Sequence, residues 1–529
     1  MTATAAPKKG SQLKITYSAM NADMTEFHKA FEDGLAWARK NMGQDHPLYI
    51  DYKPVPGVGE PIVDTSPINN DWVLGRFASA SVEQVGKAVD SAHKAQKAWA
   101  RMPWKDRIKI LRKAAEEIRR RKWEIGAVMS LEVGKSRFEA MGDAEESADL
   151  IDYYCGIVEE NDGFIRPLGK LMPNEKTADV LRPFGVFVCI APFNFPMALS
   201  TGMSSAALMA GNAVVYKPAQ DTPWTGLMLY ECYKAAGVPT GVFHFITGKG
   251  SVIGDAFWTN KKVDGIVFTG SKEVGMRMVK EFSKDWPKPA LMELGGKNPT
   301  IVTDSADLDM AAEGIMKSAF GLQGQKCSAC SRVYVDKKVY KPFVEKLLEK
   351  TSKIVKGDPT QKDVYFGPVI NGRAVKTFEG AVESAHKGGK ILSGGRVMKD
   401  GLYAKGTYVE PTIAELPLDH ELFRRELFVP FLSIAPVSGF DQAIEEANKA
   451  EYGLTAGIFT KKKEEIERFF DEIEAGVCYA NRKTGATTGA WPGVQSFCGW
   501  KGSGATGKGG CGPYYVQQFM REQSRTVME

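Results

Sequence analysis

Apolar and polar positions alternate with a helical period in the first part of the chain. Between residues 81 and 145, apolar side chains recur every three or four positions among many Lys, Arg and Glu residues, as in 85–99. This spacing predicts solvated helices that each bury one face. Residues 1–80 are polar and contain three prolines and two glycines between 54 and 61, so we expect an extended arm there.

Beyond residue 176 the pattern changes to short apolar runs that alternate with helical segments. The first series predicts strands at 185–190, 213–216, 242–246 and 266–268 and helices near 199–210 and 224–236. The second predicts strands at 300–302, 331–335, 412–414, 431–436 and 457–460 and helices at 340–355 and 440–448. Such alternation predicts parallel sheets covered by helices, so we expect two α/β domains that meet near Glu293.

The composition is that of a globular protein large enough for two or three domains. Of 529 residues, 43% are apolar and 25% are charged, and 69 basic residues are mixed with 64 acidic ones. This mixing argues against a nucleic-acid partner. No apolar run reaches the roughly 18 residues of a membrane span, and the start lacks a signal sequence. Eight scattered cysteines indicate free thiols in a reducing compartment, so we expect a cytoplasmic protein.

The most reactive candidate is Cys327, which lies in the glycine-punctuated stretch 321–330, downstream of Glu293 in the segment 292–298. A thiolate can form a covalent adduct, and a nearby carboxylate can activate the water that removes it. The residues alone leave a structural alternative open. A cysteine is often a small buried hydrophobe, and a Glu beside two glycines often marks the end of a helix or a turn.

Cys327 and Cys330 also have the spacing of half a zinc site or of a redox pair. Structural zinc takes four Cys or His ligands, and the six histidines show no paired spacing that would complete such a site. We therefore predict no metal, and consider a dithiol redox role only slightly more favourable.

Two glycine-containing turns of the first series are candidates for nucleotide binding. Segments 247–254 and 268–275 each follow a predicted strand, and the second opens a helix. Free N–H groups at a helix N-terminus favour phosphate. Neither segment is a G-x-G-x-x-G fingerprint, and an ordinary strand-to-helix turn explains each one about as well.

Five motifs in order add to this picture: PFNFP around Asn194, KPAQDT from Lys217, FTGSKEVG, MELGGKNP and GQKCSA. Through them the chain resembles the aldehyde dehydrogenase superfamily from about residue 66 to 526. The resemblance implies two doubly wound parallel-sheet domains and a small β oligomerisation element. It assigns the NAD(P)-binding domain to 1–160 and 181–292, the catalytic domain to 293–490, and the oligomerisation element to 161–180 and 512–529. A homo-oligomer, either a dimer or an assembly of dimers, would follow.

The resemblance also implies roles for individual residues. Cys327 would attack the aldehyde, the Asn194 amide and the Cys327 N–H would hold the oxyanion, and Glu293 would activate water for hydrolysis. The cofactor-binding positions that it implies are Ile190, Pro192, Lys217, Gln220, Gly250, Gly254, Ser271, Val274, Leu294, Glu426 and Phe428.

The chain departs from the family pattern at Gln220, where many members have a Glu. A carboxylate there accepts hydrogen bonds from the ribose hydroxyls and repels a 2′-phosphate, so a neutral amide weakens the case for strict NAD use. We expect NAD and keep NADP as possible. Val429 stands where Gly is usual.

For the substrate, the stretch 325–332 and the loops 493–506 and 509–515 look like those of the 1-pyrroline-5-carboxylate dehydrogenases. This resemblance implies oxidation of L-glutamate γ-semialdehyde to glutamate in proline catabolism, with a substrate site formed by Phe195, Ser328, Gly502 and Ser503. Hydroxyls and loop N–H groups can bind a carboxylate without a buried Arg. Ser496 and Cys498 replace the usual Pro and Gly, so another small acidic or aromatic aldehyde stays open.

Two other classes of protein remain as alternatives. A Cys-Glu-Lys amidase or nitrilase could use Cys327 and Glu293 with Lys326 or Lys297, but it has no use for the two nucleotide turns. A non-catalytic nucleotide-binding scaffold would keep those turns but would not need Asn194, Glu293 and Cys327 together.

Overall fold

Two seven-stranded sheets organise the chain, as the computed structural model shows for residues 24–529. The first sheet has the order β12-β11-β8-β9-β10-β2-β3. Its strands are β2 (Leu48–Ile50), β3 (Lys53–Val55), β8 (Val186–Ile190), β9 (Ala213–Lys217), β10 (Phe243–Phe245), β11 (Gly265–Thr269) and β12 (Ala290–Glu293). The strands from β12 to β10 pair in parallel, whereas β2 and β3 add an antiparallel edge.

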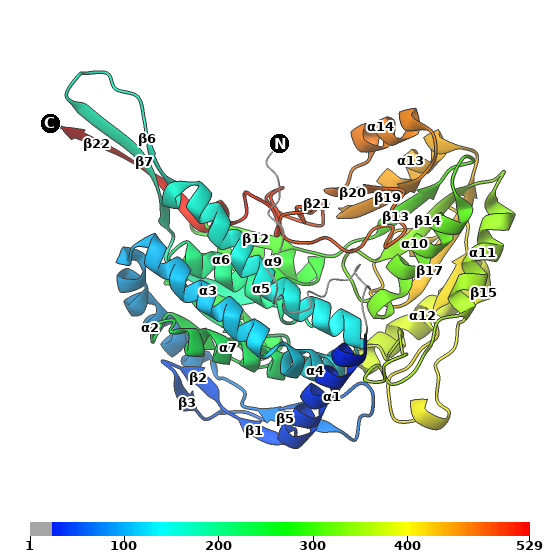
Figure 1. Cartoon of the computed structure of the whole chain (residues 1–529), viewed down its shortest axis with the longest axis horizontal. Coiled ribbons are helices and arrows are strands. Elements are labelled where there is room, and N and C mark those ends of the chain that lie inside the picture. Colours follow the sequence, from blue (N-terminus) through cyan, green and yellow to red (C-terminus); the bar gives the residue numbers. More distant parts are fainter. Residues whose placement is uncertain (1–23) are drawn as a thin grey trace.

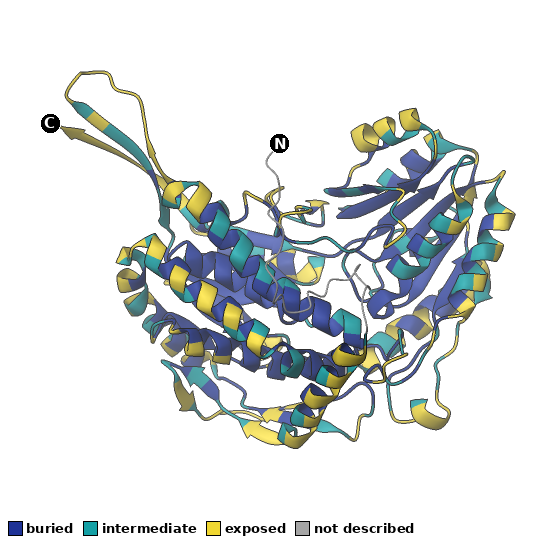
Figure 2. Cartoon of the chain, in the orientation of Figure 1, coloured by how far each residue is buried: buried dark blue, intermediate teal, exposed yellow. Residues whose placement is uncertain are grey.

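Helices cover both faces of this first sheet. One face packs against α2 (Val82–Arg101), α8 (Gly250–Trp258) and α9 (Lys272–Phe282). The other face packs against α6 (Ala198–Met209) and α7 (Pro223–Ala236). A further layer lies over these two helices and consists of α1 (Met24–Asn41), α3 (Trp104–Arg120), α4 (Lys122–Val133) and α5 (Arg137–Glu160). The central strands of both sheets are buried almost throughout, because helices shield them from water on each side, whereas the edge strands β3 and β15 are partly exposed (Figure 2).

The second sheet has the order β15-β16-β17-β14-β13-β19-β20. Its strands are β13 (Asn298–Val302), β14 (Cys330–Asp336), β15 (Lys390–Ser393), β16 (Thr412–Glu415), β17 (Phe431–Val437), β19 (Thr455–Phe459) and β20 (Val477–Ala480). Its helices are α10 (Leu308–Phe320), α11 (Tyr340–Ser352), α12 (Gly372–Gly388), α13 (Phe440–Asn448) and α14 (Lys463–Glu472). Only the edge strand β15 pairs antiparallel, so the predicted doubly wound α/β fold is confirmed.

Three small sheets complete the fold. They consist of β1 (Gln44–His46), β5 (Val73–Phe77) and β4 (Ile62–Thr65); of β18 (Tyr452–Gly453) and β21 (Trp500–Lys501); and of β22 (Met520–Met528), β7 (Glu175–Pro183) and β6 (Ile165–Pro167). The last sheet projects from the body as an arm (Figure 1). Its β22 pairs with β7 of the same chain along nine residues, between Met520 and Met528. The division into domains given above stays a prediction.

The expected extended arm over residues 1–80 is wrong for the part that the structure describes. Met24–Asn41 is a helix, and the residues up to Phe77 form five strands. Phe27, Phe31 and Leu35 recur at helical spacing and are buried. The prolines between 54 and 61 break structure only locally, so they do not prevent a helix that ends before them. Residues 1–23 lie outside the described part.

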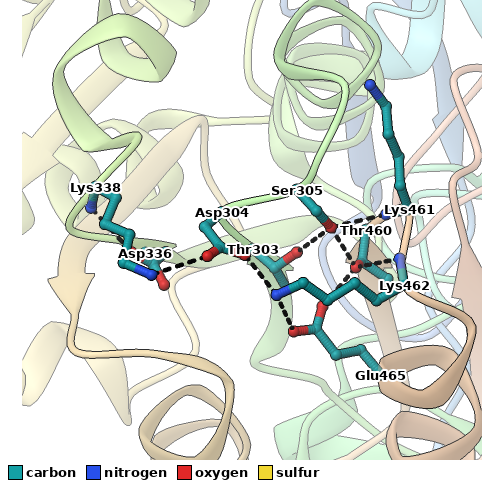
Figure 3. Close-up of polar contacts among 9 residues, drawn as sticks. All are labelled: Thr303, Asp304, Ser305, Asp336, Lys338, Thr460, Lys461, Lys462 and Glu465. Carbon is teal, nitrogen blue, oxygen red and sulfur yellow. Dashed lines mark hydrogen bonds and ion pairs between the residues drawn. The ribbon is translucent and has the colours of Figure 1, made fainter.

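Glu293 and Cys327 lie at opposite edges of their sheets. Glu293 lies at the carboxyl edge of the first sheet, and Cys327 lies at the amino edge of the second. In a doubly wound sheet a crevice opens at the carboxyl ends of the strands, where the strand order reverses. In the first sheet this point lies between β8 and β11. In the second it lies between β13 and β19, and side chains of the protein fill it, as Figure 3 shows. Asp304 Oδ2 accepts from Lys338 Nζ at 2.9 Å, and Asp304 Oδ1 accepts from Lys462 Nζ at 2.7 Å. Cys327 precedes β14 and therefore belongs to the opposite, amino-terminal edge.

Candidate active site

The loop that carries Cys327 starts with a tight left-handed turn. After α10, Leu322 and Gln323 have φ of 49° and 54°, and Gly324 follows with φ of 67°. Residues other than glycine rarely adopt this conformation, and each costs on the order of 1 kcal/mol or more. A Cβ on Gly324 would lie 2.7 Å from the carbonyl oxygen of Val429, so only glycine fits there. The surrounding structure therefore fixes the course of the chain just before the nucleophile.

Asn298 holds the same loop from the other side. Its Nδ2 donates to the carbonyl oxygens of Cys327 at 2.7 Å and Ala329 at 2.9 Å, and its Oδ1 accepts from Thr455 N at 3.0 Å. A Cβ on Gly296 would lie 2.5 Å from the Cys327 carbonyl oxygen, so a side chain at 296 would displace the loop. Segment 295–298 thus fixes the backbone of the nucleophile.

The thiol of Cys327 is partly exposed to the cavity and is one of eight free cysteines in the protein. Burial, with the Glu426 and Glu293 carboxylates nearby, raises the pKa of the Cys327 thiol to about 12, although the N–H groups of Ser328 and Cys327 oppose this shift. The sulfur is therefore protonated at neutral pH before a ligand enters. A base must take its proton before or during attack on an electrophile.

Glu293 ends β12, at the carboxyl edge of the first sheet. Burial raises the pKa of its carboxyl group well above the ordinary value, and no charged group contributes to this shift. Its Oε2 is buried and has no hydrogen-bond partner within residues 24–529. A carboxyl group with a raised pKa and a free oxygen is suited to take a proton near neutral pH.

Asn194 lies between the end of β8 and the start of α6, beside the reversal point of the first sheet. Only 2% of the residue is exposed. Within the described part of the chain its amide has no hydrogen-bond partner, so its NH₂ group remains available as a donor. The neighbouring Phe195 presents its ring to the cavity described next.

One cavity brings together Cys327, Glu293, Ser328 and Phe195. Most of its remaining wall is apolar or aromatic, and the charged side chains Glu146 and Lys326 interrupt it. The apolar and aromatic members are Leu150, Tyr154, Ala198, Leu199, Met203, Leu294, Ala490, Phe497 and Tyr515. The cavity can therefore hold a small carbonyl compound with its reacting carbon at the thiol and its remaining atoms among aromatic rings.

Gly502 and Ser503, which were expected on the substrate, do not line this cavity. The Ser503 hydroxyl is buried and accepts from Gly453 N at 3.1 Å, while its carbonyl accepts from Leu294 N at 2.8 Å. The loop is thus paired with the strand end that carries Glu293, and its hydroxyl is turned away. Gly510 and Cys511 form the corresponding part of the wall.

Several predicted cofactor residues gather at the carboxyl edge of the first sheet. Lys217 ends β9, is 7% exposed and donates from Nζ only to Pro218 O at 3.2 Å among the described residues. Burial lowers its pKa to about 8. Ser271 caps α9, with Oγ accepting from Val274 N at 3.5 Å, and Gly250 begins α8 with open space where a Cβ would stand. Two helix N-termini and an ammonium group therefore face the same edge.

The remaining cofactor positions divide between buried supports and exposed groups. Ile190 is the last residue of β8, and Pro192 follows it. Leu294 is buried, and a Cβ on Gly275 would lie 2.5 Å from it. Gly254 packs on Trp258, whereas Val274 is 41% exposed. Gln220 is exposed and borders a polar cleft that also includes Asp221 and Lys249.

Glu426 reaches the same region from the loop that precedes β17 of the second sheet. Its Oε1 accepts from Gly296 N at 2.8 Å, and a Cβ on Gly295 would lie 2.0 Å from its Oε2. Burial raises the pKa of Glu426 to about 7. Phe428 has φ of 57° and packs edge-on against Phe193 at 5.7 Å. The two glycines before Lys297 therefore let this carboxylate lie directly on the connection between β12 and β13, which also contacts the nucleophile loop.

Comparison with known proteins identifies the architecture. The aldehyde dehydrogenase family model matches residues 55–525. The chain belongs to the aldehyde dehydrogenase family. It is 37% identical over 508 residues to 1-pyrroline-5-carboxylate dehydrogenase 2 of Bacillus subtilis, which covers 95% of this chain and 96% of that protein. Identity to 1-pyrroline-5-carboxylate dehydrogenase 1 of Halalkalibacterium halodurans is 36% over 507 residues, 95% of this chain and 96% of that one.

A solved structure agrees. The crystal structure of 1-pyrroline-5-carboxylate dehydrogenase from Thermus with bound NAD has a TM-score of 0.92 and 33% identity, covering 99% of this chain and 100% of that one. The predicted resemblance to the aldehyde dehydrogenases is thus confirmed, and the protein is an oxidoreductase. Membership of this family accounts for Cys327 and Glu293 together, so the alternative of an amidase or nitrilase is set aside.

Other candidate chemistry is absent from the described residues. Within 24–529, no group of three or more His, Cys, Asp or Glu side chains is arranged to hold a metal ion. Cys330 lies in β14 with Sγ 3.2 Å from Thr300 Oγ1, inside the second domain. In the same range, no helix is both long and apolar enough to cross a membrane.

Sequence reasoning missed some residues that shape the site. Asn298 belongs to the MELGGKNP motif, which marked the segment as part of the site. The motif did not show that Asn298 holds the backbone of the Cys327 loop. The buried pair Lys135 and Asp143 gave no signal, because isolated Lys and Asp residues in a helical, charged segment predict a solvated face. Their contacts depend on the packing of α5 against α6, which a local pattern does not report.

Proposed function

We propose that this aldehyde dehydrogenase oxidises L-glutamate γ-semialdehyde, the open form of 1-pyrroline-5-carboxylate, to L-glutamate, with NAD as the cofactor. The main support is the match to 1-pyrroline-5-carboxylate dehydrogenases over nearly the whole of both chains. A second support is Ser328, which directly follows the nucleophile and lines the same cavity. The role fits proline catabolism, in which this aldehyde must be converted to an acid.

In the proposed reaction, the Cys327 thiol releases its proton to solvent as the sulfur attacks the aldehyde carbon, and a thiohemiacetal oxyanion forms. The Asn194 amide and the Cys327 N–H donate to the resulting oxyanion. Loss of hydride from the same carbon converts this adduct to a thioester on Cys327. NAD supplies the hydride acceptor. Glu293 then takes a proton from water, which attacks the thioester, releases the acid and returns the thiol.

The residues present fit a dinucleotide. Lys217 is a buried ammonium whose only acceptor among the described residues is a backbone carbonyl, so it has capacity for further acceptors such as ribose hydroxyls. Ser271 and Gly250, at the N-termini of α9 and α8, favour phosphate. Glu426 and Phe428 would hold the nicotinamide side. We propose NAD as the main cofactor, with NADP tolerated because Gln220 lacks the charge that would repel a 2′-phosphate.

A second candidate substrate is an aromatic aldehyde. Four aromatic rings line the cavity, from Phe195, Tyr154, Phe497 and Tyr515. Gly502 and Ser503, the residues expected to hold an amino-acid carboxylate, are not on its wall. Aromatic walls favour a flat apolar substrate. A substrate carboxylate would be bound by Gly502 and Ser503 only if their loop moved toward the cavity.

Initial rates of reduced-cofactor formation test the proposal. We expect kcat/KM with NAD to be highest for glutamate semialdehyde, at least about tenfold above benzaldehyde and short aliphatic aldehydes. Cys327→Ala should abolish turnover and leave NAD binding unchanged. A higher kcat/KM for benzaldehyde would support the second candidate, and retained turnover in Cys327→Ala would remove this residue from the mechanism.

We also propose a homo-oligomer, built through the arm of β6, β7 and β22, and a cytoplasmic location. Strand β22 lies at an edge of its sheet and can pair with another chain. All eight cysteines are free, which suits a reducing compartment. Size-exclusion chromatography with light scattering tests the first proposal, and localisation of a tagged full-length chain tests the second.

A further inference from the structure

A fully buried ion pair lies beside the segment that carries Asn194. Lys135 Nζ is 2.7 Å from Asp143 Oδ2, and both side chains are 0% exposed. Burial lowers the pKa of Lys135 and raises that of Asp143, while each charge opposes the shift of its partner. Removing two charges from water costs several kcal/mol per ion, and their attraction repays this only with good geometry. The pair therefore needs a reason beyond stability.

The other oxygen of Asp143 supports the start of α6. Its Oδ1 accepts from Ala198 N at 2.6 Å. Ala198 is the first residue of this helix, so its N–H has no partner inside the helix. A carboxylate at this end also interacts favourably with the helix dipole. The contact fixes the backbone four residues after Asn194, while Leu199 N donates to Phe195 O at 3.1 Å in the same turn.

The lysine of the pair contacts the same segment through an aromatic ring. Lys135 Nζ lies 3.9 Å from the ring centroid of Phe195. A second ammonium group, Lys326 Nζ, lies 5.8 Å from that centroid and pairs with Glu139 at 2.6 Å. A desolvated cation over an aromatic face is attracted by the ring quadrupole more strongly than an exposed one. Since Phe195 follows Asn194 and Lys326 precedes Cys327, the ring joins the two segments that must act together.

We infer that the Lys135–Asp143 pair is a positioning device for the oxyanion donor Asn194. Asp143 holds the backbone of segment 194–198 through Ala198 N, and Lys135 holds the Phe195 ring. Neither side chain lines the cavity that holds Cys327. Because donor groups stabilise an oxyanion only when they are fixed in advance, loosening this segment reduces the benefit of the Asn194 amide. The inference rests on the proposed role of Asn194.

The matched substitutions are Lys135→Met with Asp143→Asn. Both replacements keep side-chain size and remove both charges together, so no lone charge stays buried. They remove the cation from the Phe195 ring, and the neutral amide at 143 accepts from Ala198 N more weakly than a carboxylate does. The control is a second buried pair between α4 and α5. Lys122 Nζ lies 2.7 Å from Glu145 Oε1, with 6% and 5% of the side chains exposed. Lys122→Met with Glu145→Gln makes the same kind of change away from segment 194–198.

The decisive measurement is the single-turnover rate of hydride transfer in two backgrounds, the unmodified chain and Asn194→Ala. We expect the 135/143 double variant to slow hydride transfer about ten- to a hundredfold in the unmodified chain and less than about twofold in Asn194→Ala. The NAD dissociation constant should not change. The 122/145 control should stay within about twofold in both backgrounds.

The inference is overturned if the double variant keeps its rate, loses the same factor in both backgrounds, or behaves like the control. Failure of the proposed role of Asn194 has a different signature, because Asn194→Ala alone would then leave hydride transfer unchanged. If the double variant does not fold, Phe195→Leu keeps the ion pair and removes only the ring. The same comparison between backgrounds then applies, with a drop confined to the unmodified chain as the supporting result.

Discussion

At the scale of single residues, burial sets the chemistry of the nucleophile and of the base. It raises the pKa of the Cys327 thiol to about 12 and that of the Glu293 carboxyl well above its ordinary value. Both groups therefore hold protons more tightly than in water. A carboxylate with a raised pKa is a stronger base once ionised, which suits the removal of a proton from water.

Glu293→Gln should separate the two halves of the reaction. Hydride transfer needs the oxyanion donors and a thiol that releases its proton to solvent, whereas thioester hydrolysis needs the Glu293 carboxylate as a base. We expect a rapid burst of reduced cofactor followed by a steady rate about 10²- to 10⁴-fold below the unmodified enzyme. Stopped-flow absorbance measures both phases. A steady rate within about twofold of the unmodified enzyme, with no burst, would remove Glu293 from hydrolysis.

The choice between NAD and NADP belongs to the same scale. Gln220→Glu adds a negative charge beside the polar cleft near α8, where it should repel a 2′-phosphate. We expect kcat/KM for NADP to fall at least about tenfold, while kcat/KM for NAD changes less than about threefold. Gln361→Glu, also exposed, is the control. Equal effects on both cofactors would show that position 220 does not face the ribose.

At the scale of helices and strands, short apolar runs predicted the central strands, whereas the strands at the sheet edges were missed. Strands such as β8, β9 and β14 follow directly from short apolar runs, and helices such as α13 follow from helical spacing. The helix α1 was missed because the prolines and glycines between 54 and 61 indicated an extended arm for the whole of residues 1–80. The helical spacing of its own apolar residues did not enter that prediction. The antiparallel edges β2 and β15 give no local signal, since pairing direction depends on connections and not on side-chain pattern.

One strand residue predicts a pH dependence of stability. His244 lies in β10, is fully buried and accepts from Asp51 N at 3.3 Å, in a turn where Asp51 and Tyr52 have φ of 56° and 58°. Burial lowers the pKa of His244 to about 4. Because the unfolded chain binds this proton more tightly, the contribution is fully present above about pH 6.5 and is lost toward pH 4.

His244→Gln should therefore flatten the stability profile between pH 6.5 and 4. The histidine accounts for a change on the order of 3 kcal/mol across this range. Urea unfolding midpoints at several pH values measure it. The exposed His93→Gln should leave the profile unchanged. A His244→Gln variant whose midpoint falls as steeply as that of the unmodified chain would show that other groups cause the pH dependence.

At the scale of the whole molecule, the site is formed where the carboxyl edge of one sheet meets the amino edge of the other. Motifs predicted Cys327, Glu293 and Asn194 because each lies in a short segment with its own chemistry. The wall of the cavity was harder to predict. Ser503 follows a glycine-rich pattern, but its hydroxyl accepts from Gly453 N, a contact that depends on how the loop packs against β18.

The arm predicts how the chain assembles. Leu171 and Met172, at its tip, are 96% and 57% exposed, so we expect the partner in the proposed oligomer to cover them. Leu171→Glu with Met172→Glu should shift the assembly toward smaller species. Light scattering coupled to chromatography measures this, with Val58→Glu, which changes a residue 71% exposed on the main body, as control. An unchanged mass would show that the tip lies outside the interface.

The central claim is that Cys327 carries the acyl group during aldehyde oxidation. Its most direct test is mass spectrometry of the Glu293→Gln variant, quenched in acid during the burst with glutamate semialdehyde and NAD. We expect one added glutamyl group per chain, located on the peptide that contains Cys327. Turnover with no such adduct, or with the adduct on another cysteine, would contradict it.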